Sequence, residues 1–118
     1  MKNTEAAYAV DQVAVTNDFE PDIVDGTQVG EYRQLEPGAD AAGLRLDASV
    51  WRSDPATYEY EFATDEAFHV VEGAVVIELP EAGDTVELRA GDVAYFRAGT
   101  RSVWRITEPF KKFVVMPA

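Results

Sequence analysis

From residue 45 onward, short runs of β-prone residues alternate with turn signals at a spacing of roughly 8–12 residues, while helical periodicity is nearly absent. The turn signals are pairs of residues that tolerate positive φ or bond to their own backbone, as in Glu72-Gly73, Gly91-Asp92 and Ala98-Gly99. This rhythm predicts an all-β sandwich or barrel. Strands are predicted over residues 45–51, 56–62, 67–71, 74–79, 85–89, 93–97, 101–106 and 112–116.

Alternation along these strands predicts which side chains face the interior. Tyr60 and Phe62 share one face of their strand, whereas Glu61 belongs to the other. Ser102 and Trp104 are assigned inward, because a slip by one residue would bury two arginines in their place. The set predicted to face inward is Trp51, Tyr60, Phe62, Glu66, Phe68, Ser102 and Trp104.

The first 44 residues are less regular, with loops expected at residues 18–22 and 36–40 around short extended pieces such as 12–16. They are predicted to form an N-terminal arm on a barrel of residues 45–118, within one domain. The arm must bury Val13, Val15, Ile23 and Leu35 against its own barrel or against a partner's. It therefore predicts a homodimer, which a monomeric mass by light scattering would contradict.

The charge balance excludes several classes of partner. With a net charge of −12 and only ten scattered basic residues, the chain lacks the clustered Lys and Arg that bind nucleic acids or anionic membranes. It contains no cysteine, which excludes disulfides, thiolate metal sites and thiol nucleophiles. The first 15 residues contain no uninterrupted apolar stretch that reads as a signal peptide or membrane span, so a cytoplasmic location is expected.

Two segments, Asp-Glu-Ala-Phe-His-Val-Val-Glu-Gly at 65–73 and Gly-Asp-Val-Ala-Tyr-Phe-Arg-Ala-Gly at 91–99, resemble the paired motifs of the cupin (RmlC-like) superfamily. Within it, the chain is most similar to small single-domain cupins of unassigned function, related to the ethanolamine-utilisation and ureidoglycine aminohydrolase cupins. The pattern runs through Trp51, Pro55, Asp65-Glu66, Gly73, Gly91-Asp92, Phe96, Ala98-Gly99, Trp104, Glu108-Pro109 and Lys112. The resemblance implies a double-stranded β-helix, that is, a jelly-roll barrel.

The departures from the cupin motifs concern the metal ligands. The resemblance places Tyr60 and Phe62 where metal-binding cupins have two histidines, and Ser102 where they have the last one, so that Glu66 alone remains at a ligand position. The chain's single histidine, His69, lies three residues beyond Glu66 and is therefore expected on the opposite face of the strand. We accordingly predict no metal and no cofactor.

The inward-facing set has two interpretations. Its rings either fill a small barrel or line a pocket for a small ligand. The second gains support from Glu66, an acid whose burial among apolar groups costs free energy unless something pairs with it. Such a carboxyl is a candidate general acid or base, but a hydrogen bond to a tyrosine hydroxyl or to Arg45 would make it structural.

The leading prediction is a metal-independent cupin that binds a small organic molecule between Glu66, Tyr60, Ser102 and the two tryptophans. One alternative is an isomerase, lyase or aminohydrolase-like enzyme that uses Glu66 or a weakly held metal. Another is a structural or regulatory dimer with a filled barrel. Lys112 also belongs to the cupin pattern, but lysine near an edge strand commonly serves solubility, so it is given no role.

Overall fold

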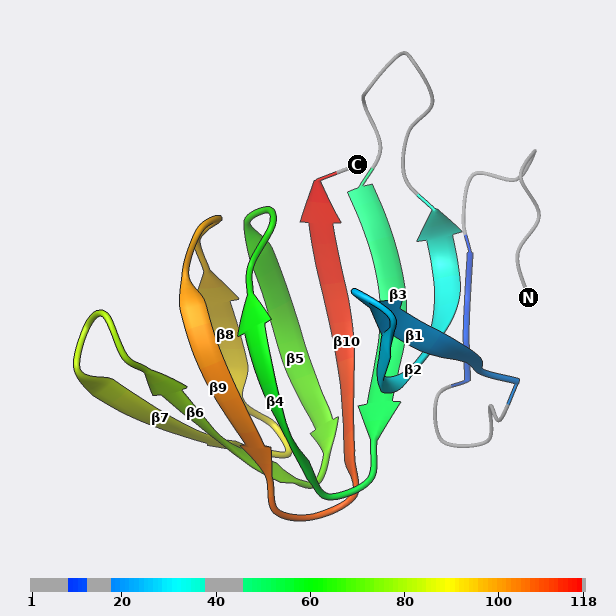
Figure 1. The fold of residues 1–118 in the computed structure, drawn as a ribbon. Coiled ribbons are helices and arrows are strands. Elements are labelled where there is room, and N and C mark those ends of the chain that lie inside the picture. Colours follow the sequence, from blue (N-terminus) through cyan, green and yellow to red (C-terminus); the bar gives the residue numbers. More distant parts are fainter. Residues whose placement is uncertain (1–8, 13–17, 38–45, 118) are drawn as a thin grey trace.

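A computed structural model describes residues 9–12, 18–37 and 46–117, and its strands form two antiparallel sheets that face each other as a jelly roll (Figure 1). The first sheet has the order β1 (Glu20–Val24), β2 (Thr27–Pro37), β3 (Leu46–Ser53), β10 (Phe110–Pro117), β5 (Glu66–Glu72) and β8 (Val93–Phe96). The second has the order β4 (Ala56–Glu61), β9 (Arg101–Ile106), β6 (Ala74–Leu79) and β7 (Asp84–Arg89). No helix in the described part of the chain is long and apolar enough to cross a membrane.

The strands predicted from residue 45 onward are all present, with ends displaced by at most two residues, and Arg45 itself lies outside the described residues. The loop expected at residues 18–22 is wrong, because β1 begins at Glu20. The reason is a hairpin: Asp25 and Gly26, with φ of 50° and 80°, turn β1 back onto β2. Asp-Gly is a strong two-residue hairpin signal, and it stands in the sequence between the two strands.

β2 extends the sheet beyond β3, with Tyr32 opposite Trp51 and Arg33 opposite Val50. The described part of the predicted arm therefore packs on its own barrel, although the side chain of Ile23 stays exposed. Val13, Val15 and most of the extended piece expected at residues 12–16 lie outside the described residues. The homodimer remains a prediction.

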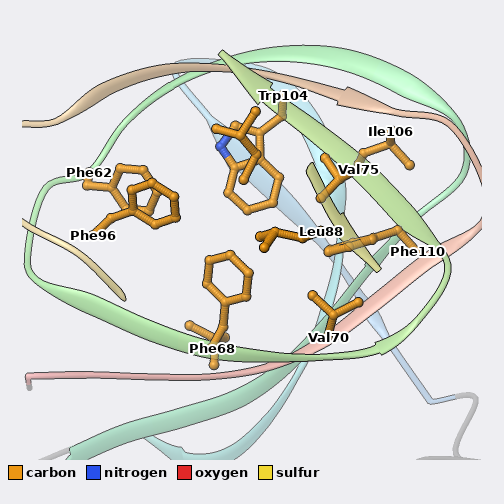
Figure 2. Close-up of a cluster of buried hydrophobic side chains, with 11 residues drawn as sticks. Phe62, Phe68, Val70, Val75, Leu88, Phe96, Trp104, Ile106 and Phe110 are labelled. Carbon is orange, nitrogen blue, oxygen red and sulfur yellow. The ribbon is translucent and has the colours of Figure 1, made fainter. Parts of the chain in front are cut away.

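The core lies between the two sheets and is rich in aromatic rings (Figure 2). Phe62 stacks on Phe96 with ring centroids 4.7 Å apart, and Trp104 lies 5.6 Å from Phe68. Burial of each such side chain stabilises the fold by roughly 1.5–3 kcal/mol. The core cluster comprises Phe62, Phe68, Val70, Val75, Ile77, Leu88, Phe96, Trp104, Ile106, Phe110 and Val114.

Asp65 fixes the start of β5. Its carboxylate accepts a 2.8 Å hydrogen bond from the backbone N–H of Ala98 and a 2.7 Å hydrogen bond from the hydroxyl of Tyr95. These two hydrogen bonds hold the pKa of Asp65 below its ordinary value, and the bond from the Ala98 backbone has the larger effect. They tie the β4–β5 loop to the turn between β8 and β9, and so set the position of the next residue, Glu66.

Candidate functional site

A cavity of about 110 Å³ is lined by residues of both sheets, including Asp22 from β1. Its walls combine three charged side chains with several aromatic rings. The residues that matter most for its chemistry are Asp22, Trp51, Tyr60, Glu66, Trp104 and Lys112.

The polar centre of the cavity is a buried ion pair. Lys112 Nζ donates a 3.0 Å hydrogen bond to Glu66 Oε2, and the side chains are 8% and 3% exposed. The hydroxyl of Tyr60 donates to the other oxygen, Oε1, at 3.2 Å. Both oxygens of the carboxylate therefore have partners, which is what the burial of a charge requires.

Lys112 comes from β10, which lies between β3 and β5 in the sheet. Its ammonium is 4.5 Å from the ring centroid of Phe68, 4.7 Å from Trp104 and 5.2 Å from Trp51, distances at which ring faces attract cations. Burial nevertheless lowers the pKa of Lys112 from its ordinary value, and the charge of Glu66 opposes this effect.

Two further titratable groups belong to the site. Burial, followed by the neighbouring charge of Glu66, raises the pKa of Tyr60, so its hydroxyl stays protonated and continues to donate. Asp22, on β1, also has a raised pKa, chiefly because of burial; Trp51 and Lys112 lower it. The cavity wall therefore carries two carboxyl groups, Asp22 and Glu66, and one amino group, Lys112.

The seven residues predicted to face inward divide into two groups. Trp51, Tyr60, Glu66 and Trp104 line the cavity. Phe62, Phe68 and Ser102 are buried, but they stand behind its walls. The Ser102 hydroxyl donates to the backbone oxygen of Tyr60 at 2.7 Å and accepts from the Trp104 indole at 3.0 Å, so it supports two of the lining rings.

A protein-family model described as the EutQ-like cupin domain matches residues 41–113. The chain belongs to the EutQ-like cupin family. No curated protein sequence matches this cupin.

Solved structures share the fold of this cupin. A putative ethanolamine utilization protein EutQ from Salmonella typhimurium is 18% identical, with a TM-score of 0.64 and coverage of 85% of this cupin and 94% of that chain. The polyketide cyclase RemF from Streptomyces resistomycificus is 22% identical, with a TM-score of 0.65 and coverage of 85% and 74%. A DUF861 family protein from Thermotoga maritima is 25% identical, with a TM-score of 0.54 and coverage of 57% and 75%. The first two likenesses establish the fold alone.

The donor set around Glu66 does not fit a divalent metal among the described residues. Within residues 9–12, 18–37 and 46–117, no three His, Cys, Asp or Glu side chains converge. The carboxylate at the remaining ligand position, Glu66, already holds an ammonium group at 3.0 Å, and a metal bound there would face that positive charge. His69 is exposed on the outer face, as its position in the strand predicts.

Sequence reasoning missed Lys112, and the prediction that it has no role is wrong: Lys112 is buried on an interior strand and pairs with Glu66. A signal was present, because Phe110 and Val114 alternate with Lys112 and are apolar, which places all three on one face. Asp22 was missed too, because β1 was not recognised as a strand.

Proposed function

We propose that this cupin binds a small organic molecule in the barrel cavity without a metal. The observation that carries the proposal is the buried Glu66–Lys112 pair on the cavity wall, beside the rings of Trp51 and Trp104. Ligand sites typically combine apolar walls with a few polar groups that fix orientation. Here the charged pair and the Tyr60 hydroxyl are such groups.

The cavity volume limits the ligand. Because an apolar cavity of roughly 150 Å³ accepts benzene, a cavity of about 110 Å³ fits a molecule of about four or five non-hydrogen atoms. Such a molecule presents a polar group to Glu66 and Lys112 and a short carbon chain to the tryptophans.

A thermal-shift screen with small acids, amides, alcohols and aldehydes tests the proposal. A ligand at 100 times its dissociation constant adds about 2.7 kcal/mol of stability, or about 10 °C for a domain of this size. Met116 lines the cavity, so Met116→Phe is expected to fill it and abolish the shift. The matched variant Met116→Leu keeps the volume and is expected to preserve the shift. A screen without any shift contradicts ligand binding and favours a filled barrel.

We also propose acid–base catalysis at Glu66 as a second candidate. It is favoured by the chain of hydrogen bonds from Tyr60 to Glu66 to Lys112, which links three titratable groups along the cavity wall. Once a ligand is found, solvent deuterium entering it in the native protein but not in Glu66→Gln supports this role. Equal incorporation in both proteins contradicts it.

A further inference from the structure

Glu66 and Lys112 are charged residues that are both buried, and they pair with each other. The environment of Lys112 contrasts with that of its neighbour Lys111. Lys111 lies on the other face of β10, where its ammonium is 3.7 Å from the exposed carboxylate of Glu72. Solubility does not account for a lysine that faces a cavity between tryptophans.

A lysine reacts as a nucleophile only after its ammonium loses a proton. Burial promotes this loss, the charge of Glu66 opposes it, and the position of Glu66 gives the proton an acceptor. Removal from water disfavours the charged form and lowers the pKa of Lys112. In addition, Glu66 Oε2 lies 3.0 Å from Nζ, within reach to accept the proton, while Tyr60 holds the other carboxylate oxygen.

We propose that Lys112 forms an imine with a small aldehyde or ketone that enters the cavity, and that Glu66 carries the protons of this reaction. The proposal rests on the proposed function, because it names the chemical class of the ligand. A carbonyl compound of about four or five non-hydrogen atoms fits the cavity volume.

The reaction balances without an added reagent. Glu66 takes a proton from the Lys112 ammonium, and the free amine attacks the carbonyl carbon, so that a C–N bond forms and the carbonyl oxygen takes the proton back from Glu66. Glu66 then accepts a second proton from the nitrogen and gives it to the hydroxyl, which leaves as water as the nitrogen lone pair forms C=N. One ammonium and one carbonyl compound thus yield one iminium ion and one water, and Glu66 returns to its carboxylate.

The site is as well suited to the product as to the free lysine. The iminium nitrogen retains one hydrogen and the positive charge, so it keeps Glu66 as its partner. The rings of Phe68, Trp104 and Trp51 surround Nζ at 4.5–5.2 Å and attract the iminium as they attract the ammonium.

Reductive trapping tests the proposal. The protein is incubated at pH 7 with propanal and sodium cyanoborohydride, and the alkylated lysine is located by peptide mass spectrometry. The variant Lys111→Arg removes the adjacent lysine and simplifies the assignment. Lys112 is expected to be alkylated at least about tenfold faster than Nα-acetyl-lysine in the same tube, because the cavity holds the aldehyde beside the amine. Lys112→Arg is expected to lose the fast phase.

The control separates this proposal from ligand binding itself. Propan-1-ol has the size of propanal but forms no imine, and its thermal shift is measured in parallel. If propan-1-ol raises the melting temperature while Lys112 reacts no faster than Nα-acetyl-lysine, the imine is refuted and the binding site stands. If neither compound shifts the melting temperature and Lys112 is not alkylated faster than the reference, both proposals are refuted. Since the trapping uses the native chain and Lys111→Arg, it does not depend on the folding of Lys112→Arg.

Discussion

Replacing Glu66 by glutamine removes the charge that faces Lys112 but keeps the size and most of the hydrogen bonding of the side chain. At 3.0 Å, with an effective dielectric constant of about 20, the lost attraction amounts to about 5.5 kcal/mol. Buried pairs that lose one partner are typically destabilised by about 3–5 kcal/mol. Because the amide oxygen still accepts from Lys112, and Phe68 and Trp104 still attract the ammonium, we expect a loss of about 3 kcal/mol.

Urea denaturation at pH 7 measures this loss. With a slope of about 1–3 kcal/mol per molar urea for small proteins, the midpoint is expected to fall by about 1–3 M. The double variant Glu66→Gln/Lys112→Met removes both charges, and we expect it to lose at least about 2 kcal/mol less than the sum of the single variants.

The ion pair between Glu78 and Arg105 is a matched control, since its length of 3.1 Å is nearly the same while both side chains are about half exposed. Glu78→Gln is expected to change the midpoint little, because water screens this pair. Equal and small effects of Glu66→Gln and Glu78→Gln would refute the reasoning, since they would mean that the Glu66–Lys112 pair is solvated in solution.

Three further predictions concern the corners and the rim of the cavity. Gly73→Ala is expected to lower the free energy of unfolding in urea by about 2–4 kcal/mol, because φ of Gly73 is +83° and a Cβ would collide with the carbonyl oxygen of Pro109. Gly83→Ala is the control: its φ is +70° but a Cβ would meet open space, so a loss of only about 1 kcal/mol is expected. Asp65→Ala is expected to lower the melting temperature at pH 7. Because hydrogen bonds lower the pKa of Asp65, the difference in melting temperature between the two proteins shrinks as the pH falls below the ordinary value of 3.8, and a constant difference would contradict the role of the charge. Asp22→Asn is expected to raise the melting temperature at pH 7, because burial raises the pKa of Asp22 and the folded state disfavours its ionised form. This gain in melting temperature disappears below pH 3.8, and a lower melting temperature at pH 7 would show that Asp22 is stabilising.

The fold could be predicted from the sequence because side chains alternate with a period of two along a strand, which fixes the face that each side chain occupies. Tyr60 and Phe62 turn inward together, and the burial of Trp104 at 3% exposure confirms the face that was assigned to it. The first 37 residues were less readable, since β1 and β2 follow from a two-residue turn at Asp25-Gly26 rather than from long alternation. Alternation identifies a strand's faces, but it does not identify its neighbours in the sheet.

That limit explains what was missed in the site. Nothing in the sequence states that β10 lies between β3 and β5, so Lys112 was interpreted as a lysine of an edge strand. Because β10 is an interior strand, its inward face is shielded from water, and the ammonium group of Lys112 needs a charged partner there. The expectation that a buried Glu66 requires a partner was sound, but the structure supplies Lys112 as well as a tyrosine hydroxyl.

The residues that carry the resemblance to cupins serve two different purposes in the structure. Some hold corners: Asp65 binds the backbone of Ala98, and Gly73 allows the close approach of Pro109. These roles account for the fold and require no ligand.

Four more of these residues, Trp51, Glu66, Trp104 and Lys112, come from four strands and meet at one cavity. A barrel that needed only to be filled would be served as well by apolar side chains of similar volume, because a buried ion pair is commonly no more stabilising than such a replacement. An ion pair on a cavity wall therefore favours a chemical task over packing. The pair also allows stability and the proposed function to be tested separately, since Glu66→Gln/Lys112→Met is expected to keep the fold and lose the proposed ligand binding.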